Sequence, residues 1–272
     1  MAFPFFETKE RVSIYRKYMI PTPKEVNDVI LSYLEEKKGS PFELAVDVGC
    51  GSGQSTPFLA DNFQKVVGID ISEAQIQEAK RVGSSPNVSY LVAAAEHMPF
   101  EDGSVDLITA TVAAHWFKMK EFMKEVDRVL KPNGCLAMAT LHTHFDLYYK
   151  DCSQSASDAL NEAYEFLGAN YSGGGFGRVK SEYKEIFDAV HFSDKKRVTN
   201  ILQKSTMSVT ELMRFTESIC IYQNFLSKDP EAAKQFLHEL QERLLKIMGV
   251  SSADTELEVV CSFLCVLARK AA

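Results

Sequence analysis

The sequence predicts an α/β fold, a doubly wound and mostly parallel sheet in one domain. Three observations lead to this prediction. Short apolar runs alternate with helical patterns at a regular pitch between residues 44 and 141. The first run ends in a turn with glycines at alternate positions, and the second ends in an acid, Asp70. No internal repeat is present. This alternation is typical of parallel sheets whose strands are joined by helices.

Each expected strand is a short apolar or β-branched run. The strands are 44–48, 65–70, 88–93, 105–112, 135–141, 197–203 and 257–268, the last being long enough to bend or bulge. Each expected helix carries apolar residues at helical spacing or follows a start signal such as Thr22-Pro23 or Ser72. The helices are 23–37, the stretch from the glycine turn to 63, 72–82, 117–130, 208–225 and 230–248.

The regular alternation stops after Leu141. We interpret residues 1–272 as one domain, in which a core at about 40–141 carries a helical insertion at about 142–192. Helices and closing strands complete it at about 193–270. A glycine cluster at 173–177 could be a mobile lid or a surface loop.

Composition narrows the functional classes. The net charge of −7 argues against a nucleic-acid partner, because phosphate neutralisation needs concentrated Lys and Arg. No apolar run approaches the roughly 18 residues of a membrane span, so we expect no membrane partner. Six cysteines without a C-x-x-C pair predict free thiols in a reducing compartment. Residues 1–7 lack the pattern of a secretory signal. We therefore expect a cytoplasmic protein, as a monomer or homodimer.

The glycine turn is the most specific local signal. Gly49, Gly51 and Gly53 form a Gly-x-Gly-x-Gly pattern, with Asp47 two residues ahead of the first glycine. A dinucleotide-binding turn has the spacing Gly-x-Gly-x-x-Gly instead. The observed variant resembles motif I of the S-adenosylmethionine (SAM) methyltransferases.

Further segments extend this resemblance over residues of about 40–141. They are the "AExLPF"-like 95–100, the fourth-strand entry 104–108 and the "RVLKPGG"-like 128–134. The chain resembles the class I SAM-dependent methyltransferases. The resemblance implies a Rossmann-like sheet of seven strands in the order 3-2-1-4-5-7-6, with the last strand antiparallel and a helical insertion after strand five.

Residues 113–117 narrow the likeness, because a His-Trp-Phe step follows strand four. With Tyr15, Tyr18 and nearby prolines, this step is similar to the methyltransferase type 11, trans-aconitate-methyltransferase-like group of small-molecule enzymes. Two departures stand out. Met19 and Ile20 replace an Arg-Pro feature common in that group, and Ala94 replaces an acid that would reach the adenine amine.

The resemblance implies SAM as the cofactor. Glycines let the backbone approach a ligand, and the helix behind them would offer N–H groups to the methionine carboxylate. Asp70 would accept hydrogen bonds from the ribose hydroxyls, and Asp47 would lie near the ammonium group. The complete predicted cofactor set is Asp47, Gly49, Gly51, Gly53, Asp70, Ile71, Ala95, Glu96 and Tyr18. Structural alternatives remain for these residues: a glycine turn made for packing, a turn acid at Asp47, a helix cap at Asp70, a surface glutamate at Glu96 and a packed aromatic at Tyr18.

His115 is the candidate catalytic residue, because open α/β sheets place ligands at the carboxyl ends of their strands. It could act as a general base, orient a substrate carboxylate, contact the cofactor or cap the strand. Trp116, His142 and Phe145 are candidates for the substrate pocket. His142 and His144 could share one face, but no Cys or acid cluster supports them, so we predict no metal.

Together these patterns predict a SAM-dependent methyltransferase that transfers a methyl group to a small-molecule acceptor, a carboxylate or a hydroxyl. Two alternatives stay open. One is an NAD-dependent oxidoreductase, against which the glycine spacing argues. The other is a SAM-binding protein without catalytic activity, which the departures at residues 19, 20 and 94 allow.

Overall fold

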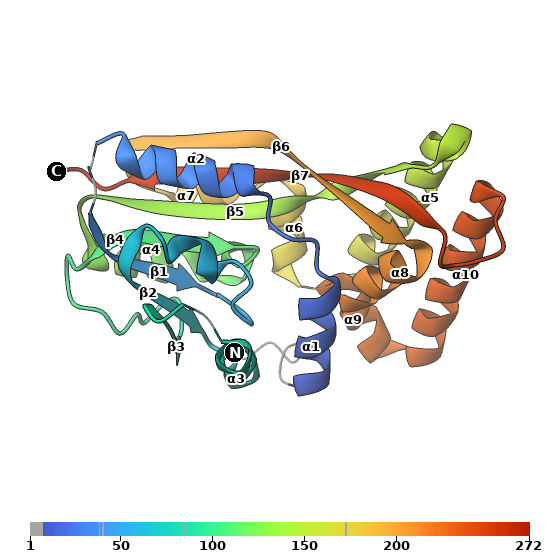
Figure 1. Cartoon of the computed structure of the whole chain (residues 1–272), viewed down its shortest axis with the longest axis horizontal. Helices are drawn as coiled ribbons and strands as arrows, with labels where there is room; N and C mark the ends of the chain where they lie inside the picture. Colours follow the sequence, from blue (N-terminus) through green and yellow to red (C-terminus); the bar gives the residue numbers. More distant parts are fainter. Residues whose placement is uncertain (1–7, 38, 40, 84, 172) are drawn as a thin grey trace.

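Figure 1 shows the protein as a computed structural model, which describes residues 8–37, 39, 41–83, 85–171 and 173–272. Its sheet has seven strands in the order β3-β2-β1-β4-β5-β7-β6. β7 runs antiparallel to both β5 and β6. This topology confirms the predicted strand order. The strands are β1 (Phe42–Val48), β2 (Phe63–Asp70), β3 (Val88–Val92), β4 (Val105–Thr111), β5 (Leu130–Tyr148), β6 (Asp194–Ser208) and β7 (Glu256–Arg269).

Helices cover both faces of this sheet and form a separate group beyond one end of it (Figure 1). The α-helices are α1 (Lys9–Tyr18), α2 (Lys24–Glu35), α3 (Glu73–Val82), α4 (Met119–Val129), α5 (Ser153–Ala169), α6 (Gly174–Lys180), α7 (Lys184–Ala189), α8 (Val209–Ser218), α9 (Cys220–Lys228) and α10 (Pro230–Met248). Short 3₁₀ turns are η2 (Thr56–Leu59), η3 (Ala114–Trp116) and η4 (Lys150–Cys152).

The two faces of the sheet bury different helices. Ile30 and Leu34 of α2 belong to the cluster that contains Ala45 of β1. Phe122 of α4 belongs to the opposite cluster, which contains Val46 of β1. Alternate residues of a strand point to opposite faces, so neighbouring residues of β1 serve both cores. Strands buried on both sides explain the near-continuous apolar runs in the sequence.

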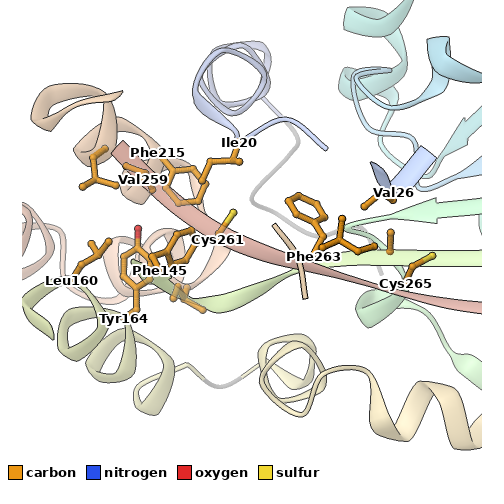
Figure 2. Close-up of a cluster of buried hydrophobic side chains, with 14 of the residues drawn as sticks. Ile20, Val26, Phe145, Leu160, Tyr164, Phe215, Val259, Cys261, Phe263 and Cys265 are labelled. Atoms are coloured by element: carbon orange, nitrogen blue, oxygen red, sulfur yellow. The ribbon is translucent and has the colours of Figure 1, made fainter. Parts of the chain in front are cut away.

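The far ends of β5, β6 and β7 extend past the parallel strands toward α5, α8, α9 and α10 (Figure 1). β5 has 19 residues, so the expected strand 135–141 is too short and the predicted insertion begins as a strand. The register shifts occur in β5 between Leu141 and Phe145 and in β6 between Val198 and Ile201, rather than in β7 as we expected. Figure 2 shows the apolar cluster that these long strands share with the helices.

The prediction of a helix between the glycine turn and residue 63 is wrong. The chain forms only η2, a single 3₁₀ turn of four residues that has Pro57 in its first turn. β2 then begins at Phe63, which leaves no room for an α-helix of several turns. The N–H groups of a long helix are therefore not available to a ligand at this turn.

Three further expectations need correction. The glycine cluster is not a loop, because residues 174–180 form α6; Ser172, which precedes it, lies outside the described residues. The helix expected at 208–225 is two helices that meet at the extended residue Ile219. The sequence analysis did not predict α1, which Thr8 caps by accepting a hydrogen bond from the N–H of Arg11.

The remaining predictions concern the cysteines, the N-terminal residues and membrane spans. All six cysteines are free thiols, as expected. The stretch at 1–7, on which the prediction about a secretory signal rested, lies outside the described residues. In the part of the chain that the structure describes, no helix combines the length and apolarity needed to cross a membrane.

Candidate active site

A cavity of about 870 Å³ lies against the carboxyl ends of the parallel strands. Its wall takes residues from the loops after β1, β2, β3 and β4, from β5, and from helices or linkers on either side of the sheet. Ligand pockets in proteins commonly have volumes of roughly 300–1,000 Å³. This cavity is therefore large enough for a cofactor and a small acceptor side by side.

Gly49 lets two loops meet at the floor of the cavity. Its φ is +68°, and a Cβ added there would lie 2.6 Å from Cβ of Ala113 in the loop after β4. Any other residue would both strain the backbone and push this loop away. The next glycine, Gly51, donates its N–H to Oδ2 of Asp70 at 2.9 Å. The turn after β1 is thereby fixed to the end of β2.

Asp70 presents a fixed carboxylate at the end of β2. Its Oδ1 accepts from the N–H of Ser72 at 2.8 Å, while Oδ2 accepts from Gly51. Burial raises the pKa of Asp70, and the backbone N–H bonds oppose this rise. Each carboxylate oxygen can accept more than one hydrogen bond, so both can still bind ligand hydroxyls.

Asp47 is buried behind the glycine turn. Its two oxygens accept hydrogen bonds from the hydroxyls of Thr56 at 2.7 Å and Thr109 at 2.9 Å. Burial raises its pKa to about 6, against the two hydroxyl hydrogen bonds, and the charge of Asp70 adds to the rise. Because a nearby cation would lower this pKa again, Asp47 favours a positively charged ligand group.

The predicted adenine-side residues also reach the cavity. Ala95 is buried, and Ile71 lines the wall with 45% of its surface exposed. Oε1 of Glu96 accepts from the N–H of Lys118 at 2.9 Å, which holds this side chain at the cavity rim. Glu96 is thus a partly buried, bonded residue rather than a free surface glutamate.

Two predicted cofactor residues do not line the cavity. A Cβ on Gly53 would lie 2.5 Å from Oη of Tyr90, so this glycine accommodates a packed side chain. Tyr18 packs at the edge of the apolar core, with Nζ of Lys17 4.9 Å from its ring centroid. Tyr15, one helical turn earlier, lies in the cavity wall instead. Burial raises the pKa of Tyr15, so this phenol stays protonated.

His115 lies in the wall on η3, with only 6% of its surface exposed. Its Nδ1 is hydrogen-bonded to Oη of Tyr183 at 2.8 Å. Burial, and then the charge of Arg178, lowers the pKa of His115 to about 3, so its ring is neutral at pH 7. Nε2 is the ring nitrogen left for a ligand.

Helix α6 closes over this histidine. Arg178 donates from Nη1 to the carbonyl oxygens of His115 at 3.1 Å and Phe117 at 3.0 Å. A Cβ on Gly175 would lie 3.1 Å from Cδ2 of His115, so the small residue allows α6 to approach. The glycine cluster thus packs a helix against the site, which its sequence alone did not indicate.

The three substrate-pocket candidates, Trp116, His142 and Phe145, all line the cavity. The ring centroids of His115 and Trp116 are 5.0 Å apart. Nε2 of His142 lies 3.4 Å from Oε1 of Glu182, whereas Nε2 of His144 lies 3.4 Å from Oδ1 of Asp146. Separate carboxylates therefore hold the two histidines that we considered as a metal pair. Across the described residues, no group of three His, Cys, Asp or Glu side chains is placed to hold a metal ion.

Gln75 is a cavity residue that sequence reasoning missed. It lies in the first turn of α3, has 4% of its surface exposed and lines the cavity. Its Oε1 is buried and finds no hydrogen-bond partner among the described residues. A buried acceptor without a partner is costly, so it is well suited to a donor group of a ligand. The sequence did contain a signal for this role. Gln75 is a polar residue beside Ile76, in a helix that starts from the Asp70 loop.

Comparisons with known proteins identify the family of this chain. The family described as "Methyltransferase domain" matches residues 46–138. A Dictyostelium discoideum protein named "Putative methyltransferase" is 32% identical over 245 residues, which cover 89% of this chain and 86% of that protein. Malonyl-[acyl-carrier protein] O-methyltransferase of Legionella pneumophila is 33% identical over 122 residues, 43% of each chain. The solved structure of a "Putative Type II Methyltransferase" from Anaeromyxobacter dehalogenans has the same fold. Its TM-score is 0.74 at 22% identity, and the match covers 94% of this chain and 100% of that one.

The chain therefore belongs to the class I SAM-dependent methyltransferases, and its cofactor is SAM. This family assignment confirms the predicted class and speaks against the NAD-dependent alternative. The residues present fit the cofactor: fixed carboxylates at Asp70 and Asp47, a backbone approach at Gly49, and an unpartnered acceptor at Gln75. The narrower likeness to the trans-aconitate group stays a prediction.

Proposed function

We propose that this methyltransferase acts on an oxygen atom of a small organic acceptor, a hydroxyl or a carboxyl group. The observation that carries the proposal is the single cavity, which continues from Asp70 and the glycine turn to His115, Phe145 and the helices beyond β5. When bound, SAM supplies a methyl group made electrophilic by its sulfonium. The similarity to an enzyme named for O-methylation supports oxygen as the acceptor atom.

The cofactor end of the cavity would hold SAM through fixed polar groups. Asp70 accepts from the ribose hydroxyls, which suits a carboxylate already oriented by two N–H groups. Asp47 acts as the counterion of the ammonium group, and Gln75 accepts a hydrogen bond from the cofactor. Ala95 and Glu96 border the adenine. Because these groups are held before binding, little ordering is left to oppose it.

His115 would orient the acceptor and take its proton. If Oη of Tyr183 accepts a hydrogen bond from Nδ1–H, Nε2 is unprotonated and carries a lone pair toward the acceptor. A neutral imidazole with a pKa of about 3 is a weak base. It is sufficient nonetheless, because a hydroxyl becomes a strong acid as its oxygen is alkylated. Most of the rate enhancement then comes from alignment in a site that excludes water.

The cytoplasmic location, the monomeric or homodimeric state and the division into core, insertion and C-terminal parts stay proposals from the sequence. A small-molecule acceptor is proposed with them, since the cavity is of small-molecule size. The acidic net charge of −7 supports the absence of a nucleic-acid partner.

Two measurements test the proposed function. Calorimetry with S-adenosylhomocysteine (SAH) and with NADH should show saturable binding of SAH alone. Release of SAH from SAM should then be detected across a panel of small hydroxyl and carboxyl compounds. Binding of NADH in place of SAH would overturn the proposal. Binding of SAH without turnover of any compound in the panel would favour the alternative of a non-catalytic SAM-binding protein.

A further inference from the structure

Aliphatic and aromatic side chains line the end of the cavity beyond β5. We call it the acceptor chamber and define it by Ile20, Phe145, Tyr164, Phe176, Phe215 and Ile219. They come from the α1–α2 linker, β5, α5, α6, α8 and the α8–α9 junction. Figure 2 shows Ile20 and Phe215 on one side of the long strands, with Phe145 and Tyr164 close by.

Aromatic contacts connect the side chains of this wall. The Phe145 ring packs edge-on against Tyr164, with centroids 5.3 Å apart, and against Phe215, with centroids 5.7 Å apart. Oη of Tyr164 is already hydrogen-bonded to Oγ1 of Thr216 at 2.9 Å. Its polar tip is therefore occupied, and Tyr164 contributes ring surface to the chamber.

The cationic side chains of the cavity wall lie outside the acceptor chamber. Of the residues that line it, Arg16 and Lys118 carry a fixed positive charge. The guanidinium of Arg16 donates to the carbonyl of Ser52 in the glycine turn. Lys118 is exposed, and its N–H bonds to Glu96 at the adenine side. Both cations thus belong to the cofactor end.

The two histidines near the chamber do not supply the positive charge that Arg16 and Lys118 fail to provide there. Nε2 of His142 lies 3.4 Å from Oε1 of Glu182, so this ring nitrogen faces a carboxylate of the chain itself. His115 is buried next to Arg178, a neighbour that disfavours a second positive charge. Within the part of the chain that the structure describes, the chamber therefore offers no fixed cation to an anionic ligand. An unpaired carboxylate buried in apolar surroundings is strongly disfavoured.

We infer that the acceptor is an uncharged, largely apolar molecule with one hydroxyl group, rather than a mono- or polycarboxylic acid. The inference rests on the proposed function and narrows it. The apolar part of the acceptor packs in the chamber, and its hydroxyl lies toward His115. Transfer forms a bond between this oxygen and the methyl carbon and breaks the carbon–sulfur bond, whose electron pair stays on sulfur. The hydroxyl proton passes to Nε2 of His115 and then to water.

A pair of matched probes tests this acceptor class in the full-length protein. 4-Propylphenol is neutral at pH 7 and 4-propylbenzoate is ionised, while their apolar parts are the same. With SAH saturating, calorimetry should give a dissociation constant at least about tenfold lower for the phenol than for the benzoate. trans-Aconitate, a tricarboxylate, should not bind measurably. Equal or tighter binding of either acid, or no binding of the phenol, would overturn the inference.

A charge placed in the chamber sharpens the test. Ile219→Lys adds a cation, and Ile219→Gln adds a neutral side chain of similar length. The lysine variant should reverse the preference toward 4-propylbenzoate, whereas the glutamine variant should keep the preference for the phenol. If the lysine variant keeps the original preference while binding SAH normally, the acceptor does not occupy this chamber.

The experiments distinguish failure of the proposed function from failure of the acceptor class. Loss of SAH binding by the unaltered protein would remove the proposed function as a whole. Normal SAH binding with a preference for the acids would leave the methyltransferase intact and remove only the acceptor class. Circular dichroism of both Ile219 variants shows whether they fold; the probes on the unaltered protein decide the inference even if they do not.

Discussion

The two ends of the cavity differ in chemical character: one is lined by polar groups and the other by apolar side chains. At the proposed cofactor end, fixed polar groups dominate the wall, as in the hydrogen bond from the N–H of Gly51 to Asp70. In the acceptor chamber, apolar side chains as far apart in sequence as Ile20 and Ile219 meet. We propose that fixed polar groups recognise the cofactor and that the packing of apolar side chains recognises the acceptor. His115 lies where the two ends meet.

The largest expected effect lies at this junction. His115→Ala should lower kcat by roughly 100- to 1,000-fold, because the acceptor loses both its orienting group and its proton acceptor. The dissociation constant for SAH should stay within about threefold, since the proposed contact is with the acceptor. Tyr183→Phe keeps the ring but removes the Oη partner of Nδ1, and its kcat should fall by about tenfold. Steady-state kinetics with calorimetry measures both quantities. Equal losses in turnover and SAH affinity would assign His115 to the cofactor end.

A second variant tests the cofactor end alone. Asp70→Ala should raise the dissociation constant for SAH by about 100-fold, because charge-assisted hydrogen bonds to the ribose are lost at roughly 1.5–3 kcal/mol each. Asp61→Ala, which removes an exposed acid near the start of β2, is the matched control and should not change it. Calorimetry decides the matter. Unchanged affinity in Asp70→Ala would remove Asp70 from the ribose.

The pH dependence of binding probes the charge at the same end. The pKa of Asp47 is raised to about 6 in the free protein. A bound ammonium group favours the ionised form, so SAH affinity should fall as the pH decreases below about 6, by up to about tenfold per pH unit. Asp47→Asn should bind SAH more weakly at pH 7 and show a shallower fall. Calorimetry between pH 5 and 8 measures both curves. Matching curves for the two proteins would show that Asp47 has no cationic partner.

Asp47 also links pH to stability. Its raised pKa means that the folded protein favours the protonated form. The stability it contributes is present below its unfolded value of 3.8 and is lost as the pH rises through about 6. Without ligand, Asp47→Asn should therefore have a higher melting temperature than the unaltered protein at pH 7. Thermal unfolding checks the sign.

The smallest effect is expected at Gln75. Gln75→Met has similar length and removes the unpartnered Oε1. Without ligand the variant should be as stable as the unaltered protein or more so, because no hydrogen bond is lost. Its dissociation constant for SAH should nevertheless rise by about tenfold. Thermal unfolding and calorimetry together check this opposite pair of changes. Unchanged SAH affinity would make Gln75 a packing residue only.

Sequence reasoning reached the sheet and most of the cofactor end because their signals are local. The glycine turn and the Ser72 cap, which accepts from the N–H of Gln75 at 3.3 Å, depend on a few consecutive residues. It failed at α6, where a glycine cluster typical of loops forms a helix that packs on η3. It also failed after the glycine turn, where Pro57 and the early start of β2 limit the helix to one 3₁₀ turn. Tertiary contacts and chain length override local preference in both cases.

By itself, the sequence determined the strand order, the cofactor family and the positions of Asp47, Asp70 and His115 at strand ends. The positions of the strand ends follow from local apolar runs and turns, whereas the strand order and the cofactor follow from the resemblance of the motifs in residues 49–53, 95–100 and 128–134 to a known family. Only the tertiary structure decided that Tyr183 is hydrogen-bonded to His115 and that, among the described residues, Oε1 of Gln75 has no partner and the chamber beyond β5 has no fixed cation. Such contacts join residues far apart along the chain, and no local pattern encodes which of them will meet.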